Sequence, residues 1–185
     1  MNITVTPDTF HFVAFDAALI RRVAEHLVTA LGLGDRRVDI EVDETTPLAR
    51  ISVDLPAATS GAITIRAESG AFEDTRTPRS QSETATATAL GRVLLRASDR
   101  LSGGFAEAPH DRELTLPQSA AWEAYCVGRL ERLGVAVNQQ RWRYNFRNRH
   151  GFHDAADAAF DRLWAGEGLT WAELDQISRD AAAPI

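Results

Sequence analysis

Apolar and polar residues alternate along neighbouring segments in the first third of the chain. Val38, Ile40 and Val42 alternate with charged residues, and the pattern continues through residues 51–55 and 63–66. A period of two predicts strands with one face against a core and the other face in water. Because short, turn-rich stretches connect these segments, we expect an antiparallel meander of three to four strands, covered on one face by helices.

Five further segments have apolar residues spaced by three and four, which predicts amphipathic helices. They cover residues 16–31, 82–102, 115–133, 154–164 and 170–179. Residues suited to capping stand at four of the starts: Asp16 and Asp154 as N-caps, and Thr115 and Thr170 each followed three residues later by Gln or Glu. The expected fold class is therefore α+β, with a mostly helical C-terminal third.

The length of 185 residues is typical of a single domain. Residues 67–82 are polar and lack a regular period, so we expect an irregular loop there. The segment 105–112, which contains Pro109, is the expected internal linker. It would separate a sheet-containing part at 1–104 from a helical part at 113–185.

The basic residues of the chain are all arginine. There are 20 of them and no lysine, which together with the many alanines indicates a GC-rich coding sequence. Without a lysine amine, the chain cannot supply the nucleotide-binding lysine of P-loop proteins and kinases, or a Schiff base to pyridoxal phosphate. The sequence also lacks Gly-x-Ser-x-Gly, Gly-x-Gly-x-x-Gly and Cys-x-x-Cys motifs. We therefore expect no cofactor, apart from a divalent metal under one hypothesis.

The single cysteine, Cys126, shares a predicted helix face with Trp122 and Leu130, which predicts a buried, unreactive thiol. One cysteine cannot form an internal disulfide, and this favours a reducing compartment. The N-terminal residues lack the regions of a signal peptide, and no apolar run approaches the roughly 18 residues of a membrane helix. We expect a cytoplasmic protein that does not bind a membrane.

The most unusual segment is Arg-Trp-Arg-Tyr-Asn-Phe-Arg-Asn-Arg-His at 141–150. Residues 132–153 contain five arginines and no carboxylate, although the formal net charge of the chain is −6. In a strand, the alternation would place aromatic rings on one face and guanidinium groups on the other. Guanidinium groups bind carboxylates and phosphates, and aromatic rings stack on bases. The candidate ligand-binding residues are Arg141, Trp142, Arg143, Tyr144, Arg147 and Arg149.

An alternative interpretation of the same segment is structural. The aromatic face would then belong to the core, and the arginines would pair with the acidic remainder of the chain or with a second subunit.

A candidate metal site follows the arginine–aromatic segment. His150 and His153 are three residues apart, and Asp157 lies four residues further on. On a helix such spacings bring side chains to one face, and neutral imidazole with carboxylate can ligate zinc. Against this, Gly151 would interrupt the helix, and an ordinary solvated helix face has the same aspartate spacing.

Two classes of function remain open. The first is a non-enzymatic binding or regulatory module that uses the arginine–aromatic segment. Its partner would be a protein or a second copy of the chain, or else an anionic small molecule or single-stranded nucleic acid. The second is a metal-assisted hydrolase with its site around residues 150–157. Segregated charge and missing catalytic motifs favour the first.

Overall fold

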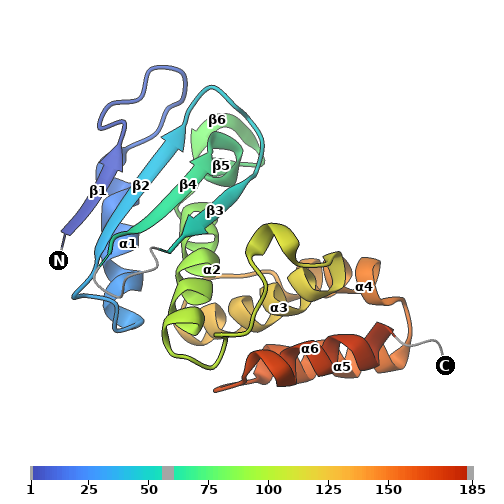
Figure 1. Ribbon diagram of the computed structural model, residues 1–185. Coiled ribbons are helices and arrows are strands. Elements are labelled where there is room, and N and C mark those ends of the chain that lie inside the picture. The colour runs from blue at the N-terminus through green and yellow to red at the C-terminus, as the bar shows by residue number, and fades with distance from the viewer. Residues whose placement is uncertain (1, 56–60, 183–185) are drawn as a thin grey trace. The chain divides into compact units, whose positions relative to one another are not determined.

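The computed structural model describes residues 2–55 and 61–182 (Figure 1). The chain forms two compact units, Met1–Ser98 and Asp99–Ile185, which we call the sheet unit and the helical unit. The division falls within a helix, α2 (Glu83–Leu101). The segment 105–112, expected as a linker, lies inside the helical unit.

The sheet unit is built on a mixed four-stranded sheet in the order β1-β2-β4-β3 (Figure 1). Its strands are β1 (Asn2–Thr6), β2 (Arg37–Asp43), β3 (Ile51–Asp54) and β4 (Ile63–Glu68). β1, β2 and β4 are parallel, and only the edge strand β3 is antiparallel to its neighbour β4. In this register Val38 lies between Ile3 on one side and Ile63 on the other.

The antiparallel meander expected from the sequence is wrong, although the α+β class is confirmed. Alternation reports only that one face of a strand is covered, and a parallel strand with helices on one side has the same pattern. Helix α1 (Ala17–Ala30) connects β1 to β2 and returns the chain across the sheet, so these strands run parallel. β4 then pairs with β2, which places β3 at the edge.

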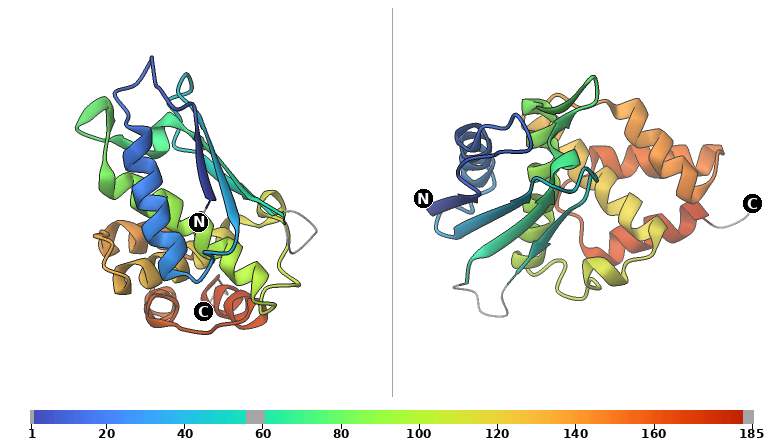
Figure 2. Two further views of the ribbon diagram at one scale, coloured as in Figure 1. Left: turned by 90° about the vertical axis from the view of Figure 1, so that its left-hand side faces the viewer. Right: turned by 90° about the horizontal axis from the view of Figure 1, so that it is seen from above.

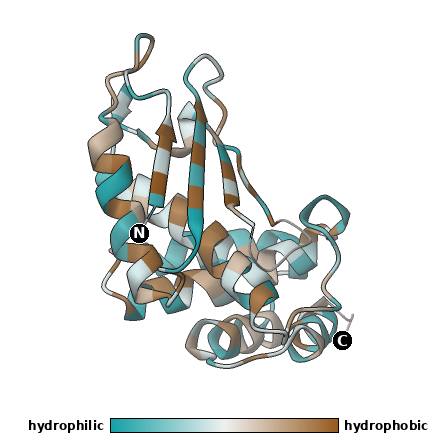
Figure 3. Cartoon of the chain, turned by 60° about the vertical axis from the view of Figure 1, so that its left-hand side comes forward, coloured by the Kyte–Doolittle hydropathy of each residue, from teal (hydrophilic) through white to brown (hydrophobic). Residues whose placement is uncertain are grey.

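Helix α1 and the first part of α2 lie on one side of the sheet (Figure 2). Apolar and polar residues alternate along the strands, as the bands in Figure 3 show. The strands bury Val5, Ile40 and Ile65, and α1 buries Ile20 and Leu27. Since each buried aliphatic side chain stabilises the fold by about 1.5–3 kcal/mol, this one apolar layer holds the unit together.

The segment expected as an irregular loop is structured. It forms a 3-10 turn, η1 (Ser69–Ala71), and a two-stranded ribbon of β5 (Glu73–Asp74) and β6 (Thr77–Gln81). Arg79 in β6 has a positive φ of 64°, and its guanidinium donates to the Ser69 hydroxyl at 3.1 Å and to the Glu44 carbonyl at 2.6 Å. These strands are short and mostly polar, so they lack the alternation of apolar and polar residues by which a strand is predicted from sequence.

The helical unit contains the end of α2 and, in its described part, the helices α3 (Leu116–Arg132), α4 (Gln139–His150), α5 (Asp154–Ala165) and α6 (Trp171–Ala182), with a 3-10 turn η2 (Asp111–Glu113) before α3. Phe105, Trp122 and Trp171 pack together with ring centroids 4.8–6.2 Å apart. Beside them the buried Asp99 accepts hydrogen bonds from the Trp122 indole at 2.8 Å and from Arg129 at 2.7 Å. The mostly helical C-terminal third is therefore confirmed.

Capping residues predicted from the sequence begin three helices as expected. Asp16 caps α1, and Thr115 opens a capping box at α3. At the start of α6, Thr170 and Glu173 form the expected reciprocal hydrogen bonds. The cap of α5 is His153, however, and the expected Asp154 is the first helical residue. Because an N-cap needs only a hydrogen-bond acceptor, a ring nitrogen of His153 takes this place and accepts from the Ala156 N–H at 3.2 Å.

Two further expectations concern burial and length. Cys126 is fully buried, as its helix face predicted. In the part of the chain that the structure describes, no helix is both long enough and apolar enough to cross a membrane.

Candidate functional site

The arginine–aromatic segment forms helix α4, so the strand considered for it is wrong. Residues four apart share a helix face, and the inward-facing ones are Trp142, Phe146 and His150. Phe146 and His150 are buried, whereas Trp142 is half-buried. The alternation of arginines with aromatic residues therefore has no structural counterpart, and the four-residue spacing of three rings was the informative pattern.

Phe146 and His150 hold α4 against α5 and α6. Their rings stack with centroids 3.8 Å apart, and Phe146 also meets Phe160 of α5 edge-on at 5.8 Å. Nδ1 of His150 lies 3.1 Å from the Phe146 carbonyl oxygen, and Nε2 lies 2.9 Å from Oγ of Ser178 in α6. A neutral ring that donates from Nδ1 and accepts at Nε2 satisfies both partners. Burial lowers the pKa of His150 and so favours this neutral form.

Two arginines fasten α4 to α5. Arg147 donates to both carboxylate oxygens of Asp157, at 2.7 and 2.5 Å. Arg143 donates to Asp161, and its guanidinium lies 4.6 Å from the centre of the Phe160 ring. The hydrogen bond from Arg147 lowers the pKa of the Asp157 carboxyl, so this carboxylate remains charged and paired. The ion pairs of these two guanidinium groups therefore agree with the structural interpretation of the segment, in which its arginines pair with acidic residues of the chain.

The opposite side of α4 is exposed and carries no carboxylate. We call it the α4 outer face, and it consists of Arg141, Tyr144, Asn145, Asn148, Arg149 and Phe152. Gly151 ends the helix with a φ of 110°, and the next residue, Phe152, lies against Tyr144. The two rings meet edge-on with centroids 5.8 Å apart, yet Tyr144 is 57% exposed and Phe152 is 63% exposed. Aromatic residues of this kind are enriched in the cores of protein interfaces.

The charge of the outer face comes from two guanidinium groups. Arg141 and Arg149 are exposed, and neither makes an ion pair with any other residue that the structure describes. The remaining arginine of the segment 132–153, Arg132, donates to the carbonyl oxygens of Trp164 and Gly166 at 2.7 Å each. Within this segment, positive charge without an ion-pair partner in the described part of the chain is therefore confined to the α4 outer face.

The proposed metal ligands have partners within the protein. His150 is held as described above, and Asp157 is paired with Arg147. His153 caps α5 through Nδ1, and its Nε2 lies 3.1 Å from the carbonyl oxygen of His150. Across residues 2–55 and 61–182, no group of three or more His, Cys, Asp or Glu side chains is arranged to hold a metal ion.

Half of the six candidate ligand-binding residues lie on the outer face, namely Arg141, Tyr144 and Arg149. The others, Trp142, Arg143 and Arg147, lie toward the body of the unit. Sequence reasoning missed Asn145, Asn148 and Phe152, because their position becomes apparent only when residues 141–152 are placed on a helix.

Comparison with protein-family models, curated proteins and solved structures gives no significant match. The chemistry of the α4 outer face is therefore argued from its own residues.

Proposed function

We propose that the chain is a binding module that holds an acidic segment of a partner protein on the α4 outer face. The observation that carries this proposal is the pair of exposed guanidinium groups, Arg141 and Arg149, which form no ion pair with residues 2–55 or 61–182. They lie on a helix that Arg143 and Arg147 fasten to α5. An exposed aromatic pair accompanies them, formed by Tyr144 of the helix and Phe152 just beyond its end. Because the helix is fixed before binding, little ordering of the backbone is needed when a partner docks.

The spacing of the outer face suggests what the partner carries. Arg141 and Arg149 are eight residues apart, which is about 12 Å along a helix at 1.5 Å per residue. A guanidinium binds a carboxylate through two parallel hydrogen bonds. Between the two arginines along α4, Tyr144 offers apolar surface, and Asn145 and Asn148 offer amide donors and acceptors. Phe152, just beyond the helix end, adds its ring to that of Tyr144. The expected partner segment has carboxylates about 12 Å apart with an apolar residue between them.

Overall charge favours a protein partner over single-stranded nucleic acid. A nucleic acid is gripped along successive phosphates by a continuous basic groove, and affinity grows with the number of phosphates neutralised. The outer face has two cations that lack an ion pair among the described residues, in a chain of net charge −6. Arginine and tyrosine are, by contrast, common among the few residues that contribute most of the binding energy in protein interfaces.

Fluorescence anisotropy with a labelled peptide of alternating glutamate and leucine tests the proposal. Reversing both charges in Arg141→Glu/Arg149→Glu is expected to weaken binding about tenfold or more, because each attraction becomes a repulsion. Raising the salt concentration is expected to weaken wild-type binding, since these charges are exposed and screened. The Phe152→Ser variant is expected to weaken binding about fivefold through lost apolar contact.

The matched control is Arg76→Glu/Arg112→Glu, which makes the same change in net charge at side chains that are 92% and 85% exposed. An equal loss of affinity in this control would show general charge attraction and contradict the proposal. Tighter binding of oligothymidylate, abolished by the outer-face variant, would assign a nucleic acid to this face instead of a protein.

A further inference from the structure

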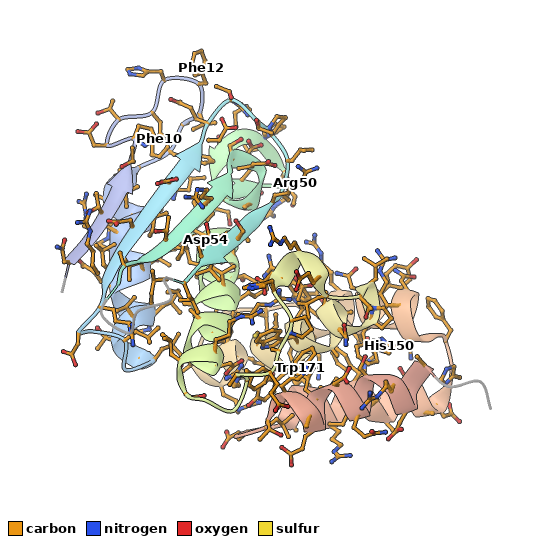
Figure 4. All side chains as sticks on the ribbon, viewed as in Figure 1. Phe10, Phe12, Arg50, Asp54, His150 and Trp171 are labelled. Carbon is orange, nitrogen blue, oxygen red and sulfur yellow. The ribbon has the colours of Figure 1, made fainter. Side chains whose placement is uncertain are left out.

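The loop of residues 7–16, which follows β1 in the sheet unit, is irregular but closely held. Figure 4 shows Phe12 at this loop, and 66% of Phe12 is exposed. Oε2 of Glu44, at the end of β2, accepts hydrogen bonds from the backbone N–H groups of His11 and Phe12, each at 2.6 Å. Two consecutive peptide groups therefore point at a single carboxylate oxygen.

A guanidinium group holds the next peptide, which joins Phe12 to Val13. Nε and Nη2 of Arg79 lie 3.2 and 3.1 Å from the carbonyl oxygen of Phe12. Nη2 also lies 2.6 Å from the carbonyl oxygen of Glu44. Arg79 thus links the loop to the backbone that carries Glu44, and it fixes the direction of the Phe12–Val13 peptide. Holding this neighbouring peptide restrains the loop that carries the two N–H groups.

Consecutive N–H groups that converge on one point form a nest, a backbone arrangement that binds oxyanions. The N–H of Phe12, followed by the N–H and imidazole of His11 and the N–H of Val13, lowers the pKa of Glu44, so its carboxylate is well stabilised there. Glu44 is only half-buried, and His11 and Phe12 are exposed. Solvent therefore reaches the nest, and an ion from solution could reach the same N–H groups.

We propose that the nest at His11 and Phe12 is an oxyanion-binding site and that Glu44 is its internal occupant. A carboxylate or phosphate ligand binds when Glu44 swings away, so the side chain acts as a built-in competitor. A tethered group has an effective concentration of about millimolar or higher, so a free anion must exceed this to displace it. This site lies in the sheet unit and does not depend on the α4 outer face.

NMR titration of the His11 and Phe12 amides with sodium acetate, and separately with sodium phosphate, tests the proposal. In Glu44→Ala the nest is vacated, and saturable shifts at both amides are expected. In the wild type the same shifts should need about tenfold more anion, because Glu44 competes. Glu44→Gln, which keeps the shape and one acceptor but loses the charge, is expected to fall between the two. If only acetate or only phosphate causes saturable amide shifts, the ligand is a carboxylate or a phosphate, respectively.

The control variant is Glu25→Ala, an equal change in charge on the exposed side of α1, and it should titrate like the wild type. Sodium chloride at matched ionic strength removes general salt effects. Absence of saturable shifts in folded Glu44→Ala and Glu44→Gln would overturn the oxyanion site. Equal affinity in the wild type and Glu44→Ala would overturn the role of Glu44 as occupant.

Discussion

At the scale of a single residue, His150 shows how burial sets a protonation state. Its ring is stacked on Phe146, and both of its nitrogens have partners in the protein. Protonation would place a second donor at Nε2, where the Ser178 hydroxyl can still accept by turning, but it would also place a charge among apolar groups. Burial lowers the pKa of His150, and the nearby His153 lowers it further.

The stability of the wild type should therefore fall in mildly acidic solution. The unfolded chain takes up a proton on His150 near pH 6.5, whereas the folded protein does so only at lower pH. The contribution of the neutral His150 ring to the free energy of unfolding is fully present above the unfolded pKa. It is lost as pH falls from about 7 to about 5. Urea unfolding of the wild type and of His150→Gln over this pH range measures the free energy of unfolding. Its decrease with falling pH should be smaller in the variant.

His26→Gln serves as the reference, since this histidine is exposed on α1. The free energy of unfolding of this variant should change with pH as that of the wild type does. If His150→Gln and the wild type lost stability in parallel, the buried ring would not be the group that titrates.

At the scale of elements, the sequence predicted helices better than strand order. Capping by Asp16 and Thr115 identified helix starts, because a cap depends on a few adjacent residues. The partners of β2 depend on the path of the chain between strands, and alternating residues contain no such information. The α4 outer face was half predicted: Arg141, Tyr144 and Arg149 stood out by type, while their grouping required the helical geometry.

Helices α3 and α5 approach each other closely at Gly128 in α3. A Cβ atom there would overlap the carbonyl oxygen of Trp164 in α5 and lie 2.8 Å from its carbonyl carbon. Gly128→Ala should therefore force α3 and α5 apart and destabilise the protein by about 1–3 kcal/mol, despite the higher helix propensity of alanine. Urea unfolding followed by circular dichroism measures the change.

Gly104→Ala is the matched substitution in the same unit, where a Cβ atom would meet its nearest neighbours at an ordinary 4.0 Å. It should leave stability nearly unchanged. Equal stability of the two variants would mean that α3 and α5 are not in close contact at Gly128.

At the scale of the whole molecule, the chain carries its positive charge entirely on arginine. Guanidinium stays charged at all physiological pH values and does not react as an amine. An amine-reactive ester should therefore add at most one group to this chain, at the N-terminal amine, in the folded and in the denatured state. Intact-mass spectrometry counts the adducts, and a second adduct would contradict the expectation.

The same property bears on how a partner of the α4 outer face can be trapped. Cross-linkers that join lysine amines would find no such amine on this chain, whatever the partner offers. Reagents that activate carboxylates or react with guanidinium groups are the suitable choice.

The aromatic core of the helical unit has a spectroscopic consequence. Trp122, Trp142, Trp164 and Trp171 all belong to residues 99–185, as do both tyrosines, while residues 1–98 have phenylalanine alone. Near-ultraviolet absorption and intrinsic emission therefore originate almost wholly in one half of the chain. Events at the nest around Glu44 would pass unseen in those spectra, whereas a ligand on Tyr144 would quench or shift them.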